Sequence, residues 1–99
     1  MKNQKQDVGK LRYDLVPFDA LDKVVEVLTI GAAKYEPNNW LRDSEVKDIV
    51  RYEAALLRHM SEHMQGRLID EESGQEHIAH VACNALFILG LREKFNEAD

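Results

Sequence analysis

The stretch RHMSEHMQGRLIDEESGQEHIAHVACN, residues 58–84, decides the predicted fold and holds all four histidines of the chain. Apolar residues recur at helical spacing on both sides of it, while its middle, residues 67–72, is short and acidic. This pattern predicts two helices joined by a short loop. Because short connections make successive helices antiparallel neighbours, we expect a helical hairpin with the histidines near its closed end.

The bounds of these two helices follow from capping signals. The first is predicted to run over residues 44–65, with an N-cap at Asp43 or Ser44 and Gly66 as its C-cap. The second is predicted to begin at a capping box formed by Ser73 and Glu76 and to end near residue 94. On it, five apolar residues form one arc that we expect to face the core, namely Ile78, Val81, Ala82, Ala85 and Leu89.

A further helix is predicted upstream, from Pro17, which suits a first helical turn, to about Tyr35. Gly31 lowers its helix propensity and is expected to allow a close approach by another helix or a ligand. Residues 1–9 are predicted to form a flexible arm. Residues 10–95 are predicted to form a single all-α domain of three main helices.

The histidines admit two interpretations. Single helix-end histidines usually make local hydrogen bonds, and we favour that interpretation for His63. His59, His77 and His80 are expected to converge at the edge of the core, where polar groups need partners. With Asp70 arriving from the acidic loop, they suit a divalent metal. Asn84 lies on the same edge as His77 and His80.

Three further polar or aromatic positions leave alternatives open. Glu53 falls inside the apolar arc of its helix, where a carboxylate needs a cation or a donor. Trp40, in a loop with two asparagines, suits either base stacking or an apolar plug, and composition favours the plug. Lys10 and Arg12 suit phosphate binding, although solvated charges are favoured on that stretch alone.

Composition narrows the class of protein. The 99 residues are 44% hydrophobic and carry a net charge of −5, which argues against a surface for nucleic-acid polymers but allows a free nucleotide. The single cysteine, Cys83, is predicted to be a core thiol in a reducing compartment. No signal peptide or membrane span is predicted, so we expect a cytoplasmic protein without membrane contact. Three amphipathic helices leave apolar edges, which predicts a dimer or tetramer.

Several motifs, taken in order, resemble one family. They are Gly-Lys-x-Arg-Tyr-Asp-Leu-x-Pro at 9–17, Gly-Ala-x-Lys-Tyr-x-x-x-Asn-Trp at 31–40, Arg-His at 58–59 and Ser-Gly-x-x-His-x-x-His-x-x-x-Asn at 73–84. Together they are similar to the phage-type dATP/dGTP diphosphohydrolase domain. That family resembles the MazG-like all-α nucleoside triphosphate pyrophosphohydrolases, which form oligomeric helical bundles. The clan's Glu-x-x-Glu and Glu-x-x-Asp motifs are absent here.

The resemblance implies a metal-dependent enzyme that cleaves purine deoxynucleoside triphosphates to monophosphate and pyrophosphate, in the cytoplasm of a phage host. Mg²⁺ or Mn²⁺ is expected as cofactor, or Zn²⁺, which the histidines would also suit. The expected metal ligands come from the set His59, Asp70, Glu72, His77 and His80. The expected general base is one of Glu53, Glu72 and Glu76. The expected substrate-binding residues are Lys10, Arg12, Lys34 and Arg58 for phosphates, and Asn39, Trp40 and Asn84 for the base.

Two other functions stay open at this point. The small size and the missing acidic pairs also suit a phage protein that sequesters a nucleotide, or a nucleotide-derived signal, without hydrolysing it. A purely structural helical assembly would bind no nucleotide and would gain no thermal stability from one.

Overall fold

The computed structural model describes residues 8–42 and 44–96, and these residues form helices and loops without a named strand. A short 3-10 helix, η1 (Tyr13–Leu15), precedes three long helices: α2 (Phe18–Tyr35), α3 (Lys47–Met64) and α4 (His77–Lys94). The predicted all-α class and its three main helices are therefore confirmed. The predicted arm over residues 1–9 lies largely outside the described residues.

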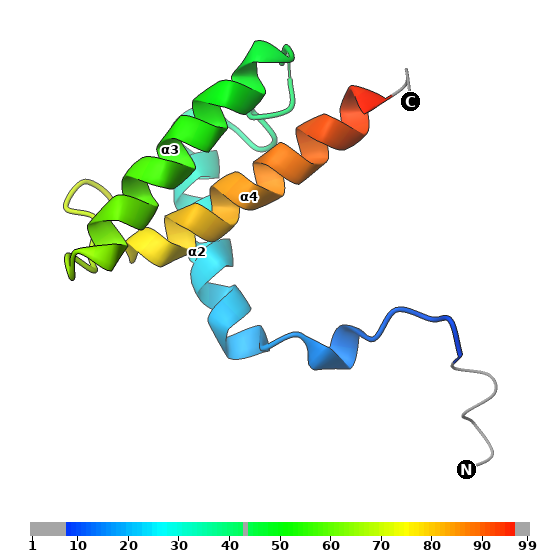
Figure 1. Cartoon of the computed structure of the whole chain (residues 1–99), viewed down its shortest axis with the longest axis horizontal. Helices are drawn as coiled ribbons and strands as arrows, with labels where there is room; N and C mark the ends of the chain where they lie inside the picture. Colours follow the sequence, from blue (N-terminus) through cyan, green and yellow to red (C-terminus); the bar gives the residue numbers. More distant parts are fainter. Residues whose placement is uncertain (1–7, 43, 97–99) are drawn as a thin grey trace.

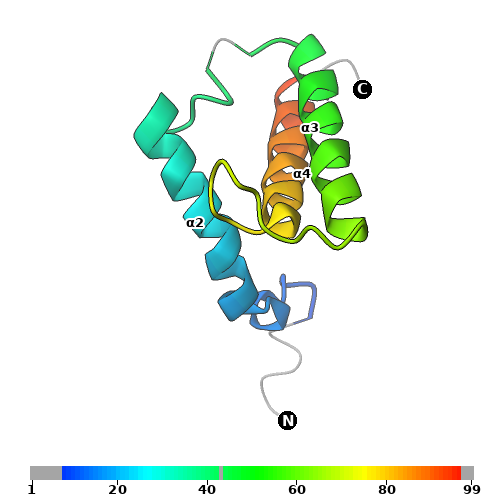
Figure 2. The same ribbon diagram turned by 90° about the vertical axis from the view of Figure 1, so that its left-hand side faces the viewer.

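Helices α3 and α4 form the predicted antiparallel hairpin, closed by the loop between Met64 and His77 (Figure 1). Helix α2 contacts α4: it passes behind α4 in Figure 1 and lies beside the hairpin in Figure 2. The segment before α2, with η1, leads away from the hairpin. The histidines near the hairpin's closed end are thus brought together by α3, α4 and their loop.

The predicted helix ends are partly wrong. Pro17 is the N-cap residue of α2, as expected. Helix α3 begins at Lys47, because Ser44 donates its hydroxyl proton to the Leu41 carbonyl at 2.8 Å instead of capping the helix. The Asp43 alternative lies outside the described residues. Helix α4 begins at His77 without a side-chain cap, so the predicted capping box at Ser73 is also wrong.

The buried face of α4 also differs from the predicted apolar arc. Its buried residues are His77, Ala79, Val81, Cys83, Asn84 and Leu91. Leu89, which the arc placed in the core, is 66% exposed. The reason is that α4 is apolar on nearly every side, so the hydrophobic pattern alone does not select the face that packs on α2 and α3.

Two other core predictions have clear outcomes. Cys83 is 2% exposed, its thiol donates to the Val24 carbonyl at 3.3 Å, and burial raises its pKa to about 11, as expected for a core thiol. Glu53 is exposed, so its predicted place inside the apolar arc is wrong. It lies beside the core-facing side of α3 rather than on it, which leaves its carboxylate hydrated.

Trp40 joins the loop after α2 to the last turns of α4. Its indole stacks on Phe87, with ring centroids 5.0 Å apart and an interplanar angle of 21°. The ring also lies against Gly90, where a Cβ atom would stand 2.5 Å from Cη2 of the indole. This is the packing expected of an apolar plug. Among the described helices, none is both long enough and apolar enough to cross a membrane.

Candidate functional site

The loop that closes the hairpin is held by its own backbone. Helix α3 ends at Met64 with Gln65 as its C-cap residue, one position before the predicted C-cap, and Gly66 follows with φ of 86°, a left-handed conformation that glycine adopts without strain. Ile69 and Glu76 then pair as an isolated antiparallel bridge. Inside it, the Asp70 N–H donates to the Gln75 carbonyl at 2.8 Å, and the Gly74 N–H donates to the Asp70 carbonyl at 2.7 Å. This compact turn fixes Asp70 beside the first turn of α4.

Three imidazoles meet at that point. His59 of α3 lies between His77 and His80 of α4: its ring stacks on His80 with centroids 4.4 Å apart, and its Nδ1 is 2.8 Å from Nδ1 of His77. Helical geometry explains the convergence, because His77 and His80 are one turn apart and share the face that α3 covers. His63 lies one turn further along α3 and, among the described residues, neither hydrogen-bonds to this cluster nor stacks on its rings.

The close contact between His59 and His77 defines their protonation. A hydrogen bond between two Nδ1 atoms needs one N–H donor and one lone pair, so the two facing nitrogens hold one proton between them. When the donating ring carries its proton on Nε2 instead, two Nδ1 lone pairs face the same region. Neutral imidazoles are the form of histidine that binds a metal.

Ser73, Asp70 and His80 form a second contact set that is not a catalytic triad. The Ser73 hydroxyl is 2.7 Å from Nε2 of His80 and accepts the Gln75 N–H at 3.2 Å. Asp70 Oδ2 is 3.6 Å from the same Nε2 atom. A triad uses the two ring nitrogens for different partners, whereas here one nitrogen faces both. Ser73 therefore positions the His80 ring and helps to fold the turn.

The surroundings shift the pKa values of these groups. Burial lowers the pKa of His59, and the nearby His80 lowers it further. Burial also lowers the pKa of His80, partly offset by the attraction of Asp70. Burial by itself raises the pKa of Asp70, but hydrogen bonds from Ser73 and the neighbouring imidazoles outweigh it, so the net pKa lies below its ordinary value. At neutral pH the imidazoles of His59 and His80 are therefore neutral, beside the carboxylate anion of Asp70.

These shifts predict how the metal-free protein responds to acid. Because the folded pKa values of His59 and His80 are lowered, the unfolded chain binds more protons below about pH 6.5, and the stability is lost as the pH falls through that window. We expect the free energy of unfolding, measured with urea between pH 8 and pH 5, to fall below about pH 6.5. His59→Gln should flatten this dependence. His63→Gln should leave it unchanged, and an equal flattening by both variants would contradict the assignment.

The other predicted site residues are placed unevenly around the cluster. Glu72 is exposed and pairs with Lys34 of α2 at 3.4 Å, which ties α2 to the loop. Glu76 is half-buried at the N-cap of α4, directly before His77. Glu53 is about three turns from the closed end of the hairpin, since it lies eleven positions before Met64 on α3. Of the three predicted bases, Glu72 and Glu76 therefore belong to the loop beside the imidazoles.

The predicted substrate-binding residues fall into two groups. Arg58 and Asn84 line one hollow between α3 and α4. The others lie on exposed or packed segments: Lys10 and Asn39 are exposed, Arg12 makes a bidentate pair with Asp14 at 2.7 and 2.8 Å, and Trp40 is packed on Phe87. A single chain does not bring Lys10 and Arg12 to the histidines, because their segment leads away from the hairpin (Figure 1).

Sequence reasoning missed one carboxylate and one role. Glu62 stands one turn after His59, forms a close ion pair with Arg67, and feels the charges of His59 and His77. The ion pair with Arg67 lowers the pKa of Glu62. Its spacing of three residues from His59 was the available signal. Ser73 was predicted to cap a helix, whereas its hydroxyl forms a hydrogen bond with His80.

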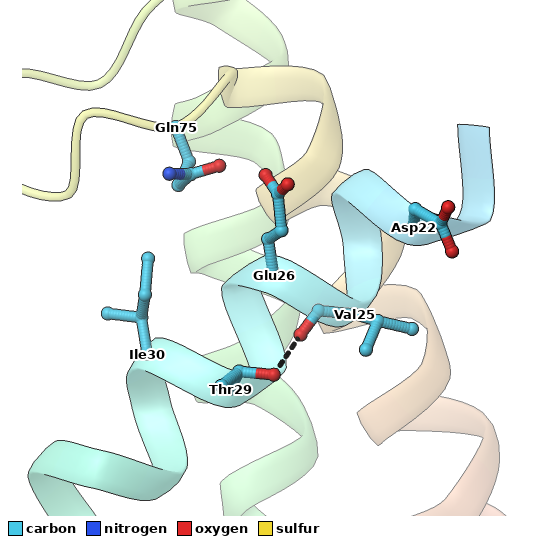
Figure 3. Close-up of a pocket in the computed structure, with 6 residues that line it drawn as sticks. All are labelled: Asp22, Val25, Glu26, Thr29, Ile30 and Gln75. Atoms are coloured by element: carbon cyan, nitrogen blue, oxygen red, sulfur yellow. Dashed lines mark hydrogen bonds between the residues drawn. The ribbon is translucent and has the colours of Figure 1, made fainter. Parts of the chain in front are cut away.

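A second hollow, of about 490 Å³, lies where α2 meets the loop (Figure 3). Glu26 points toward Gln75 there, and the Thr29 hydroxyl donates to the Val25 carbonyl at 2.7 Å. Glu26 thus turns toward the loop, but among the described residues it does not join a group of donors able to hold a metal.

The donor set that can hold a metal is His59, Asp70 and His77. Each offers one ligand atom, and these atoms lie within 4.8 Å of one another. Two imidazole nitrogens and one carboxylate oxygen suit Mn²⁺, Zn²⁺ or another transition ion better than Mg²⁺, which prefers oxygen ligands. Three protein ligands also leave positions for water or substrate. The residues present therefore fit a divalent metal.

The comparisons with known proteins agree over almost the whole chain. A family model described as "dATP/dGTP diphosphohydrolase, N-terminal" matches residues 1–99. A protein of Salmonella phage PMBT28 named "dATP/dGTP diphosphohydrolase" is 34% identical over 91 residues, which are 92% of this chain. The chain spans 30% of that relative's length. No solved structure matches the chain.

Proposed function

The chain belongs to the family of dATP/dGTP diphosphohydrolase N-terminal domains, and from this premise we propose that it takes part in cleaving purine deoxynucleoside triphosphates. In the proposed reaction a water oxygen attacks the α-phosphorus, the bond from that phosphorus to the α,β-bridging oxygen breaks, and pyrophosphate leaves. The products are a deoxynucleoside monophosphate and pyrophosphate. The observation that carries the proposal is the convergence of His59, His77 and Asp70 at the closed end of the hairpin.

His59, His77 and Asp70 would hold a divalent metal ion. Such an ion, when bound, supplies charge neutralisation for the phosphates and a more acidic water. His80 is held by Ser73 and Asp70 against the ring of His59, which keeps the face of the cluster ordered. The burial that lowers the pKa of His59 and His80 keeps their lone pairs free at neutral pH.

A carboxylate beside the cluster would accept the proton of the attacking water. Glu76 and Glu72 are the candidates that the loop brings nearest, because Glu76 precedes His77 and the charge of Glu72 acts on His80. Glu53, on the exposed side of α3, would act only toward a second chain. Arg58, next to His59, and Lys34, paired with Glu72, would bind phosphate oxygens.

We also propose that the working form is a homo-oligomer. Four apolar side chains are buried among the described residues, whereas Leu57, Met64 and Leu89 are 65%, 77% and 66% exposed. The radius of gyration is 16.4 Å, against roughly 13 Å for a compact domain of this length. A helix that is apolar on nearly every side, like α4, is normally surrounded by other helices. A second chain would also bring Lys10 and Arg12 within reach of a cluster.

If the oligomer forms through the exposed apolar face of α4, charged side chains placed on that face should weaken association. Leu86→Glu combined with Leu89→Glu should weaken association by about 100-fold or more, since each side chain loses about 1.5 kcal/mol or more of burial and a buried carboxylate adds a cost. Sedimentation velocity over a concentration series would measure this. Lys23→Glu, an exposed charged position on α2 rather than α4, is the control. Unchanged association of the double variant would rule out this face.

The reaction is tested by product analysis. Purified protein is incubated with dATP, dGTP, dCTP and dTTP, each with Mn²⁺, Mg²⁺ or Zn²⁺, and phosphorus NMR identifies the products. We expect pyrophosphate and monophosphate from dATP and dGTP with Mn²⁺. Inorganic phosphate in place of pyrophosphate would refute the proposed bond cleavage. Tight calorimetric binding with the nucleotide recovered intact would instead establish sequestration without turnover.

A further inference from the structure

The hollow between α3 and α4 has a chemistry of its own. It measures about 350 Å³, within the range of roughly 300–1,000 Å³ that ligand pockets occupy. It lies next to the histidine cluster, since Arg58 precedes His59 and the Asn84 amide donates to the His80 carbonyl at 2.9 Å. Its lining is Arg51, Tyr52, Ala54, Ala55, Arg58 and Asn84.

The hollow has an apolar floor and a cationic side chain at each end. Arg51 and Arg58 are seven residues apart on one face of α3, about 10 Å along the helix axis. Between them stand Ala54 and Ala55, which leave a low apolar floor with a guanidinium at each end. Arg51 pairs with Asp48 at 3.2 Å on an exposed surface, and Arg58 makes no ion pair among the described residues. A flat ring could lie on the alanines and stack against a guanidinium plane.

Asn84 supplies directional hydrogen bonds in the wall. It is 8% exposed, and one amide hydrogen is used by the His80 carbonyl. Its carbonyl oxygen receives no hydrogen bond among the described residues, and it is not fully buried, since no fully buried side-chain polar atom there lacks a partner. Asn84 itself lines the hollow. The second amide hydrogen is also free. One acceptor and one donor side by side are what the edge of a nucleobase requires.

We propose that this hollow binds the purine ring of the nucleotide whose phosphates reach the histidine cluster. This rests on the proposed function and adds the place and orientation of the base. Asn84 pairs with the hydrogen-bonding edge of the purine, Ala54 and Ala55 form the floor, and Arg51 closes the far end. Arg58, at the near end, turns to the phosphates. The larger face of a purine covers more of the alanine floor than a pyrimidine does, which favours purines.

Filling the floor tests the proposal. Ala54 is exposed, so Ala54→Leu keeps the fold while its side chain enters the hollow. Two probes are measured by calorimetry: deoxyadenosine monophosphate, and inorganic tripolyphosphate with Mn²⁺. We expect Ala54→Leu to weaken binding of the monophosphate by about tenfold or more and that of tripolyphosphate by no more than about threefold. Arg51→Gln should weaken the monophosphate alone, by about threefold or more. Ala20→Leu, an exposed alanine of α2, is the control.

The outcomes separate this proposal from the reaction itself. If neither Ala54→Leu nor Arg51→Gln weakens monophosphate binding, or if both probes weaken equally, the base does not lie in the hollow. If dATP yields no pyrophosphate while the monophosphate binds and responds to Ala54→Leu, the proposed hydrolysis fails and the base site stands. In an active protein, Ala54→Leu should raise KM for dATP with little change in kcat.

Discussion

Replacing His59 by glutamine is expected to lower Mn²⁺ affinity, and with it pyrophosphate release from dATP, by about 100-fold or more. His59 offers a ring nitrogen to the donor set and stacks on His80, so its loss removes one ligand and the stacking partner of a second imidazole. Glutamine retains a polar side chain of similar length without an imidazole lone pair. Metal affinity is measured by calorimetry on the metal-free protein, and activity by pyrophosphate detection.

Two further variants make this expectation specific. In the unchanged protein, Asp70 Oδ2 accepts the Ser73 N–H at 3.0 Å. Asp70→Asn keeps an oxygen that can accept this bond and removes only the charge, so it should lower metal affinity without opening the turn. His63→Gln changes a histidine of the same helix outside the cluster and should leave metal affinity within about twofold of the unchanged protein. Equal effects of His59→Gln and His63→Gln on metal affinity would refute the site.

The hairpin and its histidines could be predicted from sequence because both depend on local spacing. His77 and His80 are three residues apart, which places them on one side of any helix, and a short loop returns α4 beside α3. The cluster follows from these two facts. What spacing did not determine was which histidine of α3 faces them, since His59 and His63 share a face. The rotation of α3 against α4 brings His59 to that position.

The predicted cap of α4 was wrong because other groups compete for the Ser73 hydroxyl. Ser73 and Glu76 have the spacing of a capping box, but the Ser73 hydroxyl has stronger demands on it from the Gln75 N–H and from His80. The His80 ring therefore takes the Ser73 hydroxyl that would otherwise accept a free backbone N–H of the first turn of α4. The face of α4 was mispredicted because its sequence is apolar nearly all round, and only the neighbouring helices select the buried side.

Gly90 is expected to be the most sensitive glycine for stability. A Cβ atom there would stand 2.5 Å from Cη2 and 2.8 Å from Cζ3 of Trp40, too close for either group to remain in place. Overpacking of this kind costs about 1–3 kcal/mol, while alanine in a helix gains up to about 1 kcal/mol over glycine. We expect Gly90→Ala to lower the free energy of unfolding by about 1–2 kcal/mol, measured by urea denaturation and as a fall in Tm of about 5–15 °C.

Gly31 is the matched control, because it also lies within a helix but a Cβ there meets no atom within 4 Å. Gly31→Ala should leave Tm unchanged or raise it, because alanine adds up to about 1 kcal/mol of helix propensity to the free energy of unfolding.

If the Gly90 effect comes from the indole, Trp40→Leu should relieve it. The double variant Trp40→Leu, Gly90→Ala should then lose less stability than the sum of the losses of the two single variants. Additive losses would mean that the plug and α4 do not interact. Because Trp40 also stacks on Phe87, which packs on Tyr52 at the wall of the proposed base hollow, a displaced indole should in addition weaken nucleotide binding.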